Sequence, residues 1–232
     1  MIDIFVDLPS LLQQLDTAID CNDTSLRRAL SESCLEQATA CERYLVEWFE
    51  TFAPQGWGML GCPSLDYNNA APDDIKNAHV MCLFWTTYAQ VLTVMCSLPT
   101  SPADAATNSR RATLLVCSRS IARTVPIFFT YEAEVVDCYQ IVSFPMFFAL
   151  EGLISGEAPK VSEDQLRLLS LFMKPARGGG SLADFVVGLL EHSPVLQKTE
   201  AAKAVKTLAS EGKLCPAGWE NARNPIYHNQ QF

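Results

Sequence analysis

Three polar side chains lie in otherwise apolar stretches of the sequence, where each could act on a bound organic molecule without a metal. Arg119 lies one helical turn before Arg123 among apolar neighbours, and a planar guanidinium group binds carboxylates and carbonyl oxygens well. His79 opens the most apolar stretch, and an imidazole can transfer a proton or donate a hydrogen bond. With the phenol of Tyr131, these groups are the predicted catalytic residues. The structural alternative places the arginines in an ion-pair network with the acids of 132–137, and His79 in the core.

Aromatic residues gather in the same stretches as these polar groups. Apolar helices that are rich in aromatic residues can line a ligand cavity, although the same residues also suit a packed core. The cavity is the hypothesis that we carry forward. Its predicted walls are Trp85, Tyr88, Phe128, Phe144 and Phe148.

The sequence predicts no metal and no cofactor. Asp73 and Asp74 resemble the first half of an aspartate-rich magnesium site, but Asn77 stands where the last acid belongs, and acids also complement a helix N-terminus. The run 178–181 lacks the lysine of a nucleotide P-loop, so a turn that ends in an N-cap serine explains it. The three histidines do not cluster, and no Gly-x-Ser-x-Gly motif indicates a hydrolase.

Charge and cysteine content restrict the partners and the compartment. The formal net charge is -9, and nucleic-acid binding depends on Lys and Arg that neutralise phosphates, so no direct contact with nucleic acid is predicted. The nine cysteines include no Cys-x-x-Cys pair, which indicates buried, reduced thiols in a reducing compartment. The N-terminus is acidic and no run of about 18 apolar residues occurs, so neither a signal peptide nor a membrane span is predicted. A cytoplasmic location follows.

Helices must position these residues, because apolar side chains recur at helical spacing through most of the chain. The stretch 26–52 carries an apolar stripe that includes Trp48 and Phe52, opposite a charged face, whereas 73–98 is apolar nearly all round and belongs at the centre. The apolar loop 54–72 is expected to fold back over the domain. The predicted helices are 8–19, 26–52, 73–98, 104–131, 132–154, 162–172, 182–190 and 200–208.

The predicted fold class is all-α. Residues 1–232 are expected to form a single helical domain of about seven or eight helices around an apolar interior pocket, with an irregular tail from about 215. Proline removes an intrahelical hydrogen bond, so Pro126 should kink or break its helix and Pro145 should kink the next one.

Four stretches of the sequence carry a family resemblance. They are Asp7-Leu8-Pro9-Ser10-Leu11-Leu12, His79 to Met95 around Phe84-Trp85, Ser118-Arg119-Ser120-Ile121-Ala122-Arg123-Thr124-Val125-Pro126, and Phe144-Pro145-Met146-Phe147-Phe148-Ala149-Leu150-Glu151-Gly152. Together they resemble the C-terminal regulatory region of fungal zinc-cluster transcription factors, over most of residues 7–190. The resemblance implies an all-helical domain that senses ligands or partners. The six-cysteine DNA-binding module of that family is absent from this sequence, and we expect a free-standing protein that kept the helical domain alone.

Two functions follow from the pocket and the resemblance. In the first, the domain is a cofactor-free cyclase or isomerase of fungal secondary metabolism, of pericyclic, Diels–Alder type, whose substrate is an apolar small molecule. Such reactions need shape, desolvation and a hydrogen-bond donor, and holding the reactive conformer lowers the barrier substantially. In the second, the chain is a regulatory domain or stand-alone modulator of a zinc-cluster transcription factor, located in the nucleus, which binds a ligand or protein partner or forms a homodimer. A helical scaffold without a small-molecule site is the third hypothesis.

Overall fold

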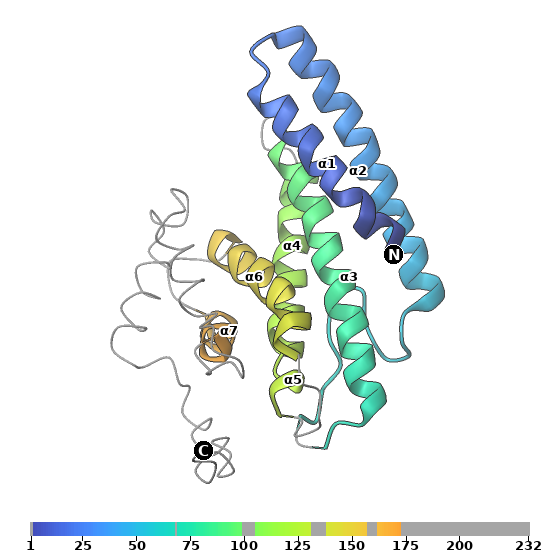
Figure 1. The fold of residues 1–232 in the computed structure, drawn as a ribbon, viewed down its shortest axis with the longest axis vertical. Helices are drawn as coiled ribbons and strands as arrows, with labels where there is room; N and C mark the ends of the chain where they lie inside the picture. Colours follow the sequence, from blue (N-terminus) through green and yellow to red (C-terminus); the bar gives the residue numbers. More distant parts are fainter. Residues whose placement is uncertain (1, 68, 99–104, 131–137, 157–161, 173–232) are drawn as a thin grey trace, which may run out of the picture.

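The computed structural model describes residues 2–67, 69–98, 105–130, 138–156 and 162–172. Within these ranges the chain forms six helices of ten residues or more and one single-turn helix, and no β-strand (Figure 1). The predicted all-α class is confirmed, whereas the predicted number of helices and the interior pocket are not. The predicted helices 182–190 and 200–208 and the tail from 215 lie outside the described residues. The helices are α1 (Ile2–Asp20), α2 (Thr24–Phe52), α3 (Pro72–Ser97), α4 (Ala105–Thr124), α5 (Ile127–Thr130), α6 (Cys138–Gly156) and α7 (Glu163–Phe172).

Helices α1 and α2 form an antiparallel hairpin that packs on α3 (Figure 1). Asp23 caps α2, because its carboxylate accepts hydrogen bonds from the backbone N–H groups of Ser25 at 2.8 Å and Leu26 at 2.9 Å. Such a cap stabilises a helix by about 1 kcal/mol. The tight connection between the helices leaves them side by side along most of α1.

Helix α1 begins at Ile2, earlier than the predicted start at residue 8, and Pro9 therefore lies inside the helix. An internal proline removes one intrahelical hydrogen bond. The buried side chains of Leu8 and Leu11 hold the helix against its neighbours on both sides of the proline. The helix starts earlier than predicted because tertiary packing outweighs the local preference of proline for a helix start.

Helix α3 is the central element, in contact with α1, α2, α4 and α6 (Figure 1). Phe84, Trp85 and Val91 are fully buried, as predicted for a helix that is apolar nearly all round. The buried hydroxyls of Thr86 and Thr87 donate to backbone carbonyls one turn earlier, at 2.7 and 2.8 Å. The helix thus satisfies these polar groups itself and leaves its surface available for packing.

The break predicted at Pro126 is confirmed. Helix α4 ends at Thr124 and the single turn α5 starts at Ile127, because proline cannot donate the hydrogen bond that would continue α4. Pro145 lies within α6, which packs on α4. At this contact Gly152 of α6 lies directly over Ser118 of α4, with no room for a side chain between them.

The loop between α2 and α3 folds back over the domain, as predicted. Its Met59 carbonyl accepts a hydrogen bond from the indole Nε1 of Trp85 at 2.9 Å, and the Trp57 ring lies 5.9 Å from the Trp85 ring, centroid to centroid. Further along, the phenol of Tyr67 donates to the backbone carbonyl of Arg123. These contacts fix the loop to α3 and α4.

The described cysteines are free thiols of two kinds. Cys34, Cys82 and Cys117 are buried, as expected for small apolar residues, and four others are half-buried. Burial raises the pKa of the Cys117 thiol to about 12, so this thiol is protonated and unreactive at neutral pH.

Two helical stretches, α3 and Ala105–Phe129, have the length and apolar composition needed to cross a membrane. In the fold, 72% of the 18-residue apolar window within α3 is buried inside the protein, and the core helix of a bundle meets the same criterion. The predicted absence of a membrane span is therefore not confirmed and stays a prediction.

Candidate functional site

The predicted pocket walls on α3 are engaged in packing and hydrogen bonds. Trp85 is fully buried, and its indole N–H donates to the Met59 carbonyl. Tyr88 is buried beside Phe84, with ring centroids 5.9 Å apart, and its hydroxyl donates to Glu42 Oε1 of α2 at 3.2 Å. Both polar groups thus have protein partners, and both rings act as core residues in this structure.

The other predicted pocket residues form two separate ring pairs. Phe128 is buried, with the His79 ring edge-on to it at a centroid distance of 6.5 Å. Phe144 and Phe148 pair edge-to-face on α6 at 4.7 Å, and Phe144 is 41% exposed. Tyr131 lies outside the described residues. The structure therefore brings His79 to Phe128 and Phe144 to Phe148.

His79 titrates at a lower pH than a free histidine, because burial disfavours its charged form and lowers its pKa from 6.5. The unfolded chain takes up a proton near pH 6.5 that the folded chain does not, so the free energy of unfolding should fall as the pH falls below 6.5. Urea unfolding of the wild type and His79→Gln from pH 7 to about 5.5 measures this effect. We expect the wild type to lose more stability than the variant over this range, and a difference that does not change with pH would contradict the assignment.

Arg119 lines a polar groove of about 690 Å³ between the α2–α3 loop, α4 and α7. At its centre Arg123 makes a bidentate ion pair with Asp164 of α7, with Nε 3.1 Å and Nη2 3.0 Å from carboxylate oxygens. Arg167 reaches the same carboxylate from Nη1 at 3.4 Å and Glu163 from Nη2 at 2.9 Å. The hydrogen bonds that Arg123 donates to Asp164 raise the pKa of Arg123. The Arg123–Asp164 pair connects α4 to α7, whereas the two pairs of Arg167 lie within α7, so Arg123 and Arg167 have structural roles in this structure.

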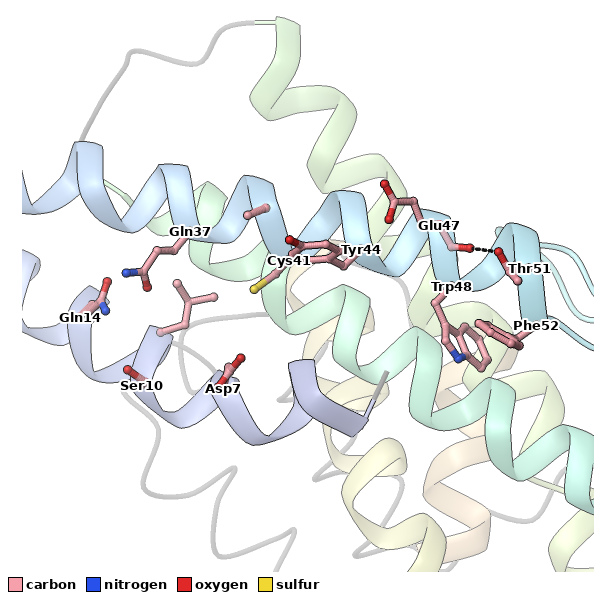
Figure 2. A pocket seen from close by; sticks show the side chains of 12 residues that line it. Asp7, Ser10, Gln14, Gln37, Cys41, Tyr44, Glu47, Trp48, Thr51 and Phe52 are labelled. Atoms are coloured by element: carbon pink, nitrogen blue, oxygen red, sulfur yellow. Dashed lines mark hydrogen bonds between the residues drawn. The ribbon is translucent and has the colours of Figure 1, made fainter.

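A second groove, also of about 690 Å³, runs between α1 and α2 on the outside of the hairpin, and we call it the α1–α2 groove (Figure 2). Its α2 wall carries Tyr44, Trp48 and Phe52, spaced one helical turn apart. Tyr44 is 52% and Phe52 67% exposed, and the rings of Trp48 and Phe52 lie 6.4 Å apart. Its lining residues are Asp7, Ser10, Leu11, Gln14, Gln37, Ala40, Cys41, Tyr44, Glu47, Trp48, Thr51 and Phe52.

Trp48 contacts both the groove and the core. Its ring stacks on Phe84 of α3 at a centroid distance of 5.6 Å, while it also lines the α1–α2 groove. The buried stripe of α2 is formed by Ser31, Cys34, Ala38 and Leu45, so the aromatic row lies to one side of it. The stripe predicted for 26–52 thus divides into a packed part and a groove-facing part.

Sequence reasoning missed this groove, although its signal was present. The i, i+4, i+8 spacing of Tyr44, Trp48 and Phe52 places three aromatic rings on one face of a helix. The same spacing also fits a packed stripe, which is the prediction for Trp48 and Phe52. None of the predicted walls on α3, α5 and α6 is among the described residues that line either groove.

The described residues contain no group of three or more His, Cys, Asp or Glu side chains that could hold a metal ion. No family model matches the chain, and neither the curated proteins nor the solved structures include a match. The resemblance to zinc-cluster regulatory domains therefore stays a prediction.

Proposed function

We propose that this protein is a helical regulatory module that binds an apolar molecule or an apolar segment of a partner in the α1–α2 groove, without contact to nucleic acid. The supporting observation is the row of Tyr44, Trp48 and Phe52 along an open groove. Burial of apolar surface contributes about 25 cal/mol per Å², and contiguous exposed apolar patches are typical of interaction sites. The groove volume of about 690 Å³ also falls within the size range of ligand sites.

The chemistry of the groove favours binding over catalysis. Burial raises the pKa of the Cys41 thiol, and the negative charge of Asp7 acts in the same direction. The thiol is therefore protonated at neutral pH, whereas the thiolate is the nucleophilic form. The predicted catalytic groups His79 and Arg119 are not among the described groove residues.

The cyclase or isomerase hypothesis stays a prediction. It requires Trp85, Tyr88 and Phe128 to face a bound substrate, whereas these side chains pack in the core of this structure. The regulatory proposal needs no rearrangement of the core. Under this proposal, the predicted location is the nucleus. The two hypotheses differ in whether a bound molecule is recovered unchanged.

Binding of the neutral apolar dye Nile red tests the proposal. We expect its fluorescence to rise on binding to the wild type, and Tyr44→Ala/Phe52→Ala to weaken that binding by about tenfold, which corresponds to about 1.4 kcal/mol. Both side chains are largely exposed, so the variant should remain folded. The control Ile19→Ala/Leu26→Ala removes one exposed apolar side chain each from α1 and α2, at positions that do not line the groove. Equal affinities of the two double variants would contradict the proposal.

A further inference from the structure

The walls of the α1–α2 groove carry charge of one sign. Asp7 of α1 and Glu47 of α2 contribute carboxylates, and the described lining residues include no Lys, Arg or His. Helix α1 has four aspartates and no basic residue, and α2 has five glutamates against three arginines. Figure 2 shows Asp7 on α1 and Tyr44 on α2, with the carboxylate of Glu47 at the edge of α2 that lies away from α1. The groove therefore offers aromatic surface flanked by negative charge.

The groove also has the length of a short helix. Its α2 wall extends from Gln37 to Phe52, which is roughly 22 Å or four turns at about 1.5 Å per residue. One aromatic ring per turn over the last half of this wall complements a helix whose apolar residues also recur once per turn. Arg43, which is not among the described lining residues, lies over the ring of Tyr44 with its Cζ 5.5 Å from the centroid, so a guanidinium group contacts one ring of this row.

We infer that the occupant of the α1–α2 groove is an amphipathic helix of a partner protein, with Lys or Arg residues on both sides of its apolar stripe. This inference rests on the proposed function and adds the chemistry of the partner. A cationic helix complements Asp7 and Glu47, which favours encounter and fixes register. A second copy of this chain would place an acidic hairpin against an acidic hairpin, and like charges at an interface are unfavourable.

The probe is a synthetic peptide of about 14 residues, roughly four helical turns, with leucine on one face and lysine on the other. Its counterpart carries glutamate in place of every lysine. We expect the lysine peptide to bind the full chain in a 1:1 complex near physiological salt, as measured by fluorescence anisotropy, and the glutamate peptide not to bind. Asp7→Lys/Glu47→Lys should weaken binding by about tenfold or more.

The matched control is Asp16→Lys/Glu36→Lys, which makes the same change in net charge on the same two helices, at exposed acids that do not line the groove. We expect this control to retain most of the affinity, and circular dichroism confirms that both variants fold. Equal losses in the two variants would show attraction to net charge alone and would overturn the inference. Equal binding of the two peptides would overturn it as well.

Two further outcomes identify other occupants and also overturn the inference. If Nile red binds the groove but the lysine peptide does not, the occupant is an apolar molecule and the proposed function stands without the helix. If native mass spectrometry shows a dimer that Tyr44→Ala/Phe52→Ala dissociates, and the peptide does not bind, the occupant is a second copy. If neither dye nor peptide binds, the inference and the proposed function both fail.

Discussion

Replacing Trp85 with alanine is expected to lower the free energy of unfolding by about 3–5 kcal/mol, the range for removal of a large buried aromatic side chain. Trp85 is fully buried in the central helix, so the truncation leaves a cavity that its neighbours cannot fill. It also removes the hydrogen bond to the Met59 carbonyl and the ring contact with Trp57. Urea unfolding followed by circular dichroism measures the change.

Trp85→Phe provides the control, because it keeps most of the ring volume but cannot donate to Met59. We expect a smaller loss of about 1–2 kcal/mol, together with faster proteolytic cleavage in the α2–α3 loop that this bond fixes. A loss below about 1 kcal/mol for Trp85→Ala would show that the indole is not packed as described.

The second large effect concerns Gly152, where α6 crosses α4. A Cβ atom at this position would lie 2.2 Å from Ser118 Oγ and 3.1 Å from Leu114 Cδ2, far inside van der Waals contact. Alanine is the better helix former by about 1 kcal/mol, but the clash forces Ser118 or the helices to move. We expect Gly152→Ala to destabilise the protein by about 1–3 kcal/mol net, measured as a change in the urea midpoint at constant slope.

Ser118→Ala should remove the loss of stability that Gly152→Ala causes. Without the hydroxyl, the nearest remaining atoms are the flexible end of Leu114 at 3.1 Å and the Ser118 Cβ at 3.3 Å. In the Ser118→Ala background, Gly152→Ala should therefore be neutral or stabilising, because its helix propensity is no longer offset. Additive effects of the two substitutions would contradict the described crossing.

The fold was largely accessible from the sequence because its main signals are local. The apolar surface of α3 predicts a central helix from composition alone, and Pro126 marks the end of α4 through the chemistry of its own ring. The start of α1 was not accessible, because Pro9 is tolerated there only through packing against other helices. The partner of Arg123 was missed for a related reason, since Asp164 lies on a different helix far along the chain.

The candidate site was harder to predict, because periodicity shows that a residue is apolar but not what covers it. The sequence predicts Trp85 and Tyr88 as cavity walls, whereas their polar atoms donate to the Met59 carbonyl and to Glu42. These contacts join different elements, and the spacing of residues along one helix does not reveal them. The spacing of the stripe also predicts a packed Phe52, whereas this side chain is 67% exposed among the described residues. The distinction between core and groove depends on which helices pack together, and the spacing of residues along one helix does not determine this.

The position of Trp48 has a consequence for communication across the protein. Its ring lies between the groove and Phe84 of the central helix, so whatever restrains it from outside also acts on the packing of α3. Thermodynamic coupling is reciprocal. A more rigid core should therefore raise the affinity of the groove for a bound molecule, and a bound molecule should reduce the mobility of the core side chains. Binding in the groove would then affect α3 through the stacked rings of Trp48 and Phe84. Helices α4 and α6 pack on α3, so the effect would extend to them.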